Sequence, residues 1–261
     1  MVNSKSEILK VTFLGTGTSQ GVPVIGCECE VCRSLDYRDK RLRVSVHLEI
    51  DGTSLVIDTG PDFRQQMLRE RISKLDAVLL THSHKDHIAG LDDVRAFNYL
   101  QGKGMPIYGT PKTLEQVKKE FYYAFEAQKY PGTPVLSLQE LTDNEFEING
   151  IKILPLPVMH LHMPVMGFRI GDFSYITDAN FISEETHSKL KGTRILALNA
   201  LQKESHQSHF TLEEALVQAK IINAEQTYFT HISHKMGLHQ AVSKELPTST
   251  ALAYDGLTVT L

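Results

Sequence analysis

Residues 81–90, THSHKDHIAG, contain the densest group of side chains that could do chemistry. His82, His84, Asp86 and His87 lie where an apolar run ends and a helical pattern begins. Because side chains alternate along a strand, His82 and His84 point to the same side. The start of the helix turns Asp86 and His87 back toward the same space. Imidazole and carboxylate ligands together suit zinc, manganese or iron, so a metal or catalytic site is favoured over a solvated turn or a metal-free histidine network.

All three cysteines lie in a second short motif, GCECEVC, at residues 26–32. Cys27, Cys29 and Cys32 have the small-loop spacing that is typical of structural zinc sites. Such a site needs four ligands, and the nearest histidine, His47, is a poor candidate for the fourth. The alternative is a loop with free thiols. An odd number of clustered cysteines disfavours a disulfide framework and favours a reducing compartment.

The whole-chain composition is that of an ordinary globular protein. Of 261 residues, 41% are hydrophobic and 22% are charged, and the formal net charge is −4. This charge disfavours broad binding to nucleic-acid phosphates. The first ten residues, MVNSKSEILK, lack the apolar core of a secretory signal, and no apolar run approaches the ~20 residues that span a bilayer. We therefore expect a cytoplasmic protein with no membrane partner.

The pattern of apolar residues predicts strands with helices between them. Strands are predicted at residues 11–15, 43–50, 54–60, 76–82, 151–158, 194–199, 226–231 and 256–261, and as a hairpin that turns at Gly171-Asp172. Helices are predicted at about 62–72, 86–100, 111–125 and 212–222. Residues 126–143 are predicted to be a surface loop. No repeat or linker is visible, so we expect one α/β domain over residues 1–261, in which helices cover β-sheets.

Two further motifs could contact a phosphate group. Residues 15–21, GTGTSQG, do not fit the dinucleotide-binding fingerprint, because the third glycine comes one position late and Pro23 follows in place of a helix. Their amides could face a site, or they could form a tight turn after an edge strand. In the basic run RDKRLR at residues 38–43, Arg41 or Arg43 could contact a substrate phosphate, or the run could be a solvated loop.

The motif HSHKDH resembles the H-x-H-x-D-H signature of the metallo-β-lactamase-fold hydrolases. That family has a later histidine, an aspartate after a strand and a last histidine after another strand. This chain has His160 in PLPVMH, Asp178 in SYITDAN and His231 in YFTHISH. The resemblance covers essentially the whole chain. It implies a four-layer αββα sandwich with the active site along one edge of the two central sheets.

The resemblance also implies two active-site metal ions, zinc or manganese. The first would be bound by His82, His84 and His160, and the second by Asp86, His87 and His231. Asp178 would bridge the two ions, with a hydroxide on the open side. His162 competes with His160 for its role, but the family pattern favours the histidine directly after the apolar strand.

The opening TFLGTGTSQGVPVIGCECEVC is similar to one branch of this family, the cyclic ribose phosphate phosphodiesterases of the carbon–phosphorus lyase pathway, which is close to the tRNase Z group. In that branch a loop of three cysteines binds a structural zinc, and the fourth ligand is a histidine three residues after the last active-site histidine. The resemblance therefore implies a zinc-binding loop at about 26–33, with the ligands Cys27, Cys29, Cys32 and His234.

Residues 208–215, SHFTLEEA, resemble the stretch in which this branch has its catalytic histidine. His209 would then protonate a leaving oxygen or stabilise phosphoryl charge. The alternative is a helix-capping segment with Thr211 or Ser208 as the cap. The branch pattern has an acidic partner for this histidine, whereas the matching position here is Asn199, which weakens the claim to the same substrate.

The remaining histidines are assigned ordinary roles. We expect His206 and His239 at the surface and His187 on a helix face.

The sequence thus predicts a dinuclear metal-dependent hydrolase, with a phosphodiesterase that acts on a small or cyclic phosphate ester as the leading hypothesis. A thioester or lactone hydrolase on the same scaffold is an alternative. A tRNase Z-like ribonuclease is disfavoured because the long basic arm of that group is absent. A non-catalytic metal-binding protein is disfavoured by the complete ligand set. The expected partner is a small-molecule phosphate ester, and a homodimer is left open.

Overall fold

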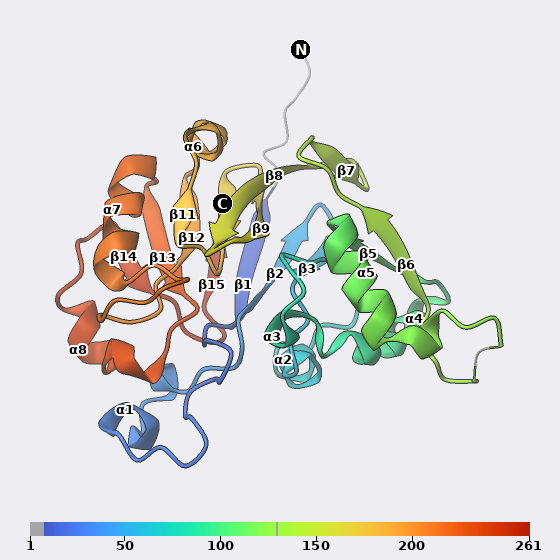
Figure 1. The fold of residues 1–261 in the computed structure, drawn as a ribbon, viewed down its shortest axis with the longest axis horizontal. Helices are drawn as coiled ribbons and strands as arrows, with labels where there is room; N and C mark the ends of the chain where they lie inside the picture. Colours follow the sequence, from blue (N-terminus) through green and yellow to red (C-terminus); the bar gives the residue numbers. More distant parts are fainter. Residues whose placement is uncertain (1–7, 129) are drawn as a thin grey trace.

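The computed structural model describes residues 8–128 and 130–261. Residues 1–7, which open the N-terminal segment assessed above for a secretory signal, and residue 129 in the predicted loop lie outside this description. Within it the strands form two sheets that lie between two groups of helices (Figure 1).

The first sheet has the strand order β15-β1-β2-β3-β4-β5-β6. It is antiparallel from β15 to β3 and parallel from β3 to β6. Its strands are β1 (Leu9–Gly15), β2 (Ser45–Ile50), β3 (Thr53–Ile57), β4 (Ala77–Leu79), β5 (Met105–Gly109), β6 (Leu136–Glu140) and β15 (Thr258–Thr260).

The second sheet has the order β11-β8-β9-β10-β12-β13-β14, with β7 paired to β8. The strands from β10 to β14 are parallel, and β9 is antiparallel to both of its neighbours. The strands are β7 (Phe146–Ile148), β8 (Ile151–His160), β9 (Met163–Ile170), β10 (Phe173–Ile176), β11 (Phe181–Ile182), β12 (Ile195–Asn199), β13 (Gln226–Thr230) and β14 (Thr250–Leu252).

Helices and 3-10 turns connect the strands. The α-helices are α1 (Glu30–Arg33), α2 (Phe63–Arg69), α3 (Lys85–Ile88), α4 (Arg95–Gln101), α5 (Pro111–Glu120), α6 (Glu184–Leu190), α7 (Leu212–Ile222) and α8 (His239–Ser243). The 3-10 helices are η1 (Tyr37–Asp39), η2 (Leu91–Val94), η3 (Tyr122–Ala124) and η4 (His234–Met236).

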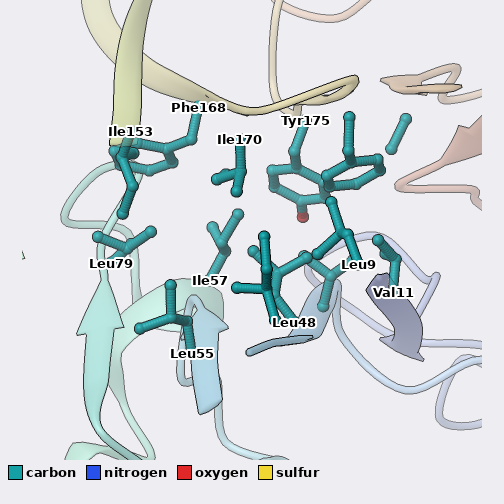
Figure 2. Packing of buried hydrophobic residues seen from close by; sticks show 14 of the residues in the cluster. Leu9, Val11, Leu48, Leu55, Ile57, Leu79, Ile153, Phe168, Ile170 and Tyr175 are labelled. Carbon is teal, nitrogen blue, oxygen red and sulfur yellow. The ribbon is translucent and has the colours of Figure 1, made fainter. Parts of the chain in front are cut away.

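The central core lies between the two sheets. Figure 2 shows side chains of the first sheet, among them Leu48 and Ile57, opposite side chains of the second sheet, among them Phe168 and Tyr175. All four are fully buried. Because alternate side chains of a strand point to opposite faces, one face of each sheet supplies this core.

A further apolar layer covers the outer face of each sheet. The first sheet packs against Phe63 of α2, Phe97 of α4 and Val117 of α5. The second packs against α7, through Leu212 and Ala215 among others. The order helix, sheet, sheet, helix confirms the predicted αββα sandwich (Figure 1).

Two expectations about local structure are wrong. The helix predicted at 86–100 is broken into α3, η2 and α4, because Gly90 packs against the neighbouring turn: its amide donates to Thr59 O at 2.8 Å, and a Cβ atom there would lie 2.2 Å from Gly60 O. The loop predicted at 126–143 contains the edge strand β6, which pairs in parallel with β5. The alternation of Leu136 and Leu138 with polar residues is the sequence pattern that indicates this strand.

No helix in the described ranges is long and apolar enough to span a lipid bilayer.

Candidate active site

The predicted metal ligands come from strand ends that meet at one edge of the two sheets. His160 ends β8, Asp178 follows β10 and His231 follows β13, and these three strands run in the same direction. The first sheet contributes the cluster that begins at His82, just after β4. The Met166 amide donates to the carbonyl before His82 at 2.9 Å and joins the two sheets at this edge.

Asp178 lies at the centre of the cluster and is 2% exposed. Its Oδ1 lies 3.1 Å from Nε2 of His231 and 3.1 Å from Nε2 of His209, and its Oδ2 lies 3.3 Å from Nε2 of His87. Asp86 Oδ2 lies 3.2 Å from the same nitrogen of His87. The potential ligand atoms of Asp86, His87, Asp178 and His231 all lie within 4.8 Å of one another.

The other three predicted ligands lie close to one another, and the ring of His82 is also 4.1 Å from that of His87. The ring centroid of His84 is 4.6 Å from that of His82 and 5.3 Å from that of His160. The potential ligand atoms of His160, Asp178 and His209 lie within 4.8 Å of one another. Asp178 therefore belongs to two close groups of donors, one with Asp86, His87 and His231 and one with His160 and His209.

Buried nitrogen atoms without partners show that these residues fit a metal ion. Within residues 8–128 and 130–261, Nε2 of His82, Nε2 of His87 and both ring nitrogens of His231 are buried and make no hydrogen bond. An unpaired buried polar atom costs about 1–3 kcal/mol. Several such atoms around two carboxylates are the donor set that a divalent cation satisfies.

The Nδ1 atoms of two predicted ligands, His87 and His160, are held by hydrogen bonds to the chain. Nδ1 of His87 donates to Asp58 Oδ2 at 2.7 Å, and Nδ1 of His160 donates to the carbonyl of Ser208 at 2.8 Å. These bonds fix the tautomer in which Nε2 carries no proton. Such partners orient metal-ligating histidines and raise their basicity.

The charges in the cluster attract cations. Burial alone would raise the pKa of Asp178, but His231 and His87 hold that pKa well below its usual range. Burial would lower the pKa of His231, but Asp178 and Asp86 raise it to about 9. The carboxylates therefore stabilise positive charge at these positions, and protons and metal ions compete for it.

His209 lies beside the ligand cluster and is 9% exposed. Its Nε2 faces Asp178, and its Nδ1 lies 3.1 Å from Ser208 Oγ and 3.2 Å from Nδ1 of His206. Burial lowers the pKa of His209 to about 4. Thr211 does cap α7, in a capping box with Glu214. The capping interpretation is thus correct for Thr211, while His209 is directed into the candidate site.

The three cysteines and His234 come together although they are far apart in the sequence. Nδ1 of His234 lies 3.3 Å from Sγ of Cys27, 3.4 Å from Sγ of Cys29 and 3.6 Å from Sγ of Cys32. The Cys32 amide bonded to Cys29 lowers the pKa of that thiol to about 6, which favours the metal-binding thiolate. Three sulfur atoms and one imidazole in contact are the donor set of a closed zinc site.

The structure also places the four remaining histidines that the sequence analysis assigned to minor roles. His162 is exposed in the turn after β8, and His206 is exposed as expected. His187 lies on α6 as expected, with Nε2 2.8 Å from Gln218 Oε1. The surface assignment of His239 is wrong: it is 5% exposed.

Arg41 is not available to a substrate. It is 4% exposed and donates to Thr16 Oγ1 at 2.8 Å and to the carbonyl of Ala253 at 2.6 Å, while its Nη2 contacts Nδ1 of His239 at 3.1 Å. The arginine therefore joins the N-terminal loop to the C-terminal strands, which explains why His239 is buried. Arg43 is paired with Asp62 at 3.1 Å.

Two cavities adjoin the cluster. One of about 270 Å³ opens beside His209, and one of about 300 Å³ opens beside His82, where Met163 and Pro164 form part of its wall. A larger cavity of about 490 Å³ next to His47 is lined by none of the predicted ligands. The candidate active site is therefore next to the two smaller cavities.

Comparison with known proteins agrees with this geometry. The family model described as "Beta-lactamase superfamily domain" matches residues 53–232, which include every predicted active-site ligand. The chain belongs to this superfamily. A solved structure described as a new diphosphatase from the PhnP family is 41% identical, covers 97% of each chain and has a TM-score of 0.92. The chain is accordingly a hydrolase with the metallo-β-lactamase fold, as the sequence predicted.

Two examples show the range of other proteins to which the chain is similar. An octanoyltransferase of Porphyromonas gingivalis is 40% identical over 252 residues, which are 95% of this chain but 51% of that protein. The chain thus spans about half the length of this curated relative. Zinc-bound PqqB of Methylobacterium extorquens shares the fold, with a TM-score of 0.79 at 21% identity over 97% of this chain and 100% of that one.

Asp58 is a functional residue of this hydrolase that the sequence analysis missed. It is fully buried, and besides His87 it accepts from the amide and the hydroxyl of Thr81, at 2.9 and 2.8 Å. Oγ1 of Thr81 in turn lies 3.0 Å from Nδ1 of His82. Asp58 therefore orients predicted ligands of both donor groups, His87 directly and His82 through Thr81. The sequence does contain a signal for Asp58: it is an acidic residue at the end of the apolar strand SLVI. That strand lies next to the strand that leads to His82.

Two aspartates and one histidine at strand ends of the hydrolase have left-handed backbone conformations. Asp58, Asp178 and His231 have φ values of 64°, 56° and 56°. Such conformations cost about 1–3 kcal/mol for residues other than glycine and concentrate at functional sites. They turn each side chain sharply off its strand and toward the cluster.

Over residues 8–128 and 130–261, no hydrogen bond joins Asn199 to His209, and the asparagine side chain instead bonds to Ala179, next to Asp178. Its Oδ1 accepts from the Ala179 amide, and its Nδ2 donates to the Ala179 carbonyl, both at 2.8 Å. An amide can make both bonds, whereas a carboxylate can only accept. The asparagine therefore anchors the turn that carries Asp178.

We expect Asn199→Asp to destabilise the hydrolase. The buried carboxylate would face the Ala179 carbonyl and leave it without a donor, which should lower the free energy of unfolding by about 3 kcal/mol. Denaturant unfolding would measure the loss, with the exposed Asn144→Asp as a control for the added charge. Unchanged stability, or a gain in turnover, would show that Asn199 does not have this role.

Proposed function

We propose that this hydrolase is a dinuclear metal-dependent phosphodiesterase that acts on a small phosphate ester, including cyclic esters. The observation that carries the proposal is the position of His209, buried, with Nε2 3.1 Å from Asp178 Oδ1 and beside both donor groups. The likeness to a diphosphatase, at 41% identity over 97% of both chains, supports phosphoryl chemistry.

Seven side chains would hold two divalent ions, zinc or manganese. The first donor group is His82, His84 and His160, the second is Asp86, His87 and His231, and Asp178 is shared. Two ions so placed would lower the pKa of a water molecule and neutralise charge on the attacked phosphoryl group.

The chain's own groups supply the remaining functions. Asp58 and the Ser208 carbonyl fix the orientation of His87 and His160 through their Nδ1 atoms. His209 presents Nε2 at the cluster, where its N–H can be donated to a phosphoryl oxygen or to the leaving oxygen. The contact of its Nδ1 with Ser208 Oγ sets the direction of the ring.

An assay of the metal-loaded protein tests the proposal. The panel comprises bis(p-nitrophenyl) phosphate, a 2′,3′-cyclic nucleotide, an acyl thioester, a lactone and a tRNA precursor. We expect turnover of the small phosphodiesters. Hydrolysis of only the thioester or the lactone would contradict the proposal, and cleavage of only the tRNA precursor would assign the protein to the nuclease alternative.

Acyl ester or thioester hydrolysis is the second candidate. It is favoured by one observation, the 40% identity of the chain to about half of an octanoyltransferase. The same cluster of ligands would serve this reaction, but His209 would not be needed to protonate a phosphate leaving group. The thioester in the panel therefore separates the two candidates.

We further propose that Cys27, Cys29, Cys32 and His234 bind a structural zinc ion. Thiolates select zinc, whereas a histidine and carboxylate site also accepts manganese. His234 follows His231 by three residues, so the zinc would hold the turn that directs His231 into the cluster. Four protein ligands leave no open position, so this ion would have no catalytic role.

Cys29→Ser should remove one zinc per chain after manganese loading, because serine is a poor zinc ligand. Cys29 and His234 are 205 residues apart, so losing this cross-link should lower the free energy of unfolding by about 5 kcal/mol. Metal analysis and denaturant unfolding provide the measurements, with Glu28→Gln as the control in the same exposed loop. Equal zinc in wild type and Cys29→Ser would show that the cysteine cluster does not bind zinc.

A further inference from the structure

The cavity of about 490 Å³ next to His47 lies on the outer face of the first sheet. Val46 and Leu48 of β2 point into the central core, so His47, which lies between them in the strand, points to the opposite face. Ser54, near the start of β3, also lines the cavity, whereas Asp58 follows the other end of that strand. Four residues of an extended strand span about 13 Å. The cavity is therefore separate from the proposed metal cluster.

The hydrogen bonds of His47 fix its tautomer. His47 is 4% exposed, and its Nε2 lies 2.8 Å from Ser54 Oγ. Ser54 donates its hydroxyl proton to the carbonyl of Lys74 at 2.7 Å. A hydroxyl has one proton, so Ser54 accepts from His47, and Nε2 carries the ring proton. Burial lowers the pKa of His47 to about 4, so at pH 7 the ring holds no second proton and Nδ1 has a free lone pair.

Nδ1 of His47 has no partner in the described part of the chain. None of the hydrogen bonds among residues 8–128 and 130–261 uses this atom. In the same ranges, the buried side-chain nitrogens without a partner all belong to His82, His87 and His231. Nδ1 of His47 is thus open to solvent, and the space that its ring lines is this cavity. A buried, neutral imidazole presents an unused hydrogen-bond acceptor there.

The charged residues of the lining leave one charge of each sign without an ion pair. Four of them are paired: Lys10 with Glu49 at 2.7 Å, Glu70 with Arg69 at 2.6 Å, and Lys74 with Asp76 at 3.0 Å. The other two, Asp51 and Arg71, are exposed and form no ion pair with any residue that the structure describes. A ligand with one charge of each sign would satisfy both.

We propose that this cavity is a binding site for a small zwitterion, a molecule with one primary ammonium group and one carboxylate. The ammonium group donates to Nδ1 of His47 and is stabilised by the charge of Asp51. The carboxylate accepts from the guanidinium of Arg71, which can form two parallel hydrogen bonds. Cavities that bind small molecules have volumes of about 300–1,000 Å³, so this cavity suits such a ligand. The site uses none of the proposed metal ligands and is therefore independent of the proposed phosphodiesterase function.

A matched pair of ligands tests the role of Nδ1. Isothermal titration calorimetry of the zinc-loaded protein with glycine, 4-aminobutyrate and 6-aminohexanoate covers an increasing separation of the two charges. We expect at least one of them to bind. The N-trimethyl derivative of the tightest ligand keeps both charges but has no N–H to donate. Its Kd should therefore be about tenfold higher, the scale of one charge-assisted hydrogen bond.

Two variants test the protein side of the same contacts. His47→Phe should raise the Kd of the tightest ligand about tenfold, and Ser54 keeps its bond to Lys74, so no donor is left unpaired. Arg71→Met should raise this Kd by a similar factor, because it removes the partner of the carboxylate. Arg64→Met is the matched control and should bind as wild type does, since Arg64 is an exposed arginine of α2 that is not part of the lining.

Long-range ¹H–¹⁵N spectra of the zinc-loaded wild-type protein give a readout that does not depend on the folding of a variant. The free protein should show His47 as the Nε2–H tautomer, and its Nδ1 resonance should shift with the ammonium ligand but not with the trimethyl derivative. An Nδ1–H tautomer, or a failure of all three amino acids to bind, would overturn the site. So would equal Kd values for both members of the ligand pair, or for wild type, His47→Phe and Arg71→Met, as binding at the metal ions would give. Absence of phosphodiester hydrolysis with these binding effects intact would contradict the proposed function alone.

Discussion

Asp178→Ala should abolish phosphodiester hydrolysis and lower the content of active-site metal. Asp178 lies within 3.3 Å of ring nitrogens on His87, His209 and His231, so its removal takes away the carboxylate that we propose both donor groups share. We expect turnover to fall by at least about 10⁴-fold, the scale seen when one member of a cooperating catalytic set is lost. Steady-state kinetics and metal analysis of the same preparation would measure both effects.

The controls for this variant follow from its backbone. Asp178 has a φ of 56°, so alanine adds left-handed strain, whereas asparagine tolerates that conformation. Asp178→Asn therefore separates loss of the carboxylate charge from loss of the fold. Asp172→Ala, in the exposed hairpin turn, is the matched aspartate control and should behave as wild type. Normal metal content and turnover in Asp178→Ala would refute the shared-ligand model.

His209→Ala should lower the rate of phosphodiester hydrolysis by about 10²–10⁴-fold, the usual contribution of a general acid or base. Metal content should stay at the wild-type level, because the seven proposed ligands remain. The physical reason is that His209 Nε2 is the buried donor that faces the cluster, 3.1 Å from Asp178. Single-turnover kinetics with bis(p-nitrophenyl) phosphate would measure the chemical step directly.

His162→Ala is the matched control, since this histidine is exposed in the turn that follows β8. The control also tests whether His160 or His162 belongs to the ligand set. Metal loss in His209→Ala would instead show that His209 is a metal ligand. The geometry allows this role, because the potential ligand atoms of His160, Asp178 and His209 lie within 4.8 Å of one another. An unchanged rate with normal metal would remove His209 from the mechanism.

Most secondary structure in the two sheets could be predicted from local patterns. The apolar runs at 11–15 and 226–231 correspond to β1 and β13, and the helix predicted at 212–222 is α7, with a capping box at its start. The apolar pattern gave a wrong prediction where contact with a distant segment determines the backbone conformation. Gly90 ends a helical turn because it packs against residues 59–60, which no local pattern contains.

The sequence by itself determined which imidazoles and carboxylates could form the candidate site. The spacing from His82 to His87 places imidazoles and a carboxylate at a strand-to-helix junction. Strand alternation and turn geometry are local properties, so the side chains that project from each strand end could be named. The resemblance to the metallo-β-lactamase-fold hydrolases supplied the order of the later ligands.

Only the tertiary structure decided how these groups are held. It brings His234 to the cysteines across more than 200 residues, and it places Asp58 on Nδ1 of His87. It pairs the Asn199 side chain with both the backbone amide and the backbone carbonyl of Ala179, and it buries Arg41 between the N-terminal loop and the C-terminal strands. Each of these contacts joins segments from different strands or loops. Their free energy depends on burial and geometry that exist only after the two sheets have packed, so no local pattern could have specified them.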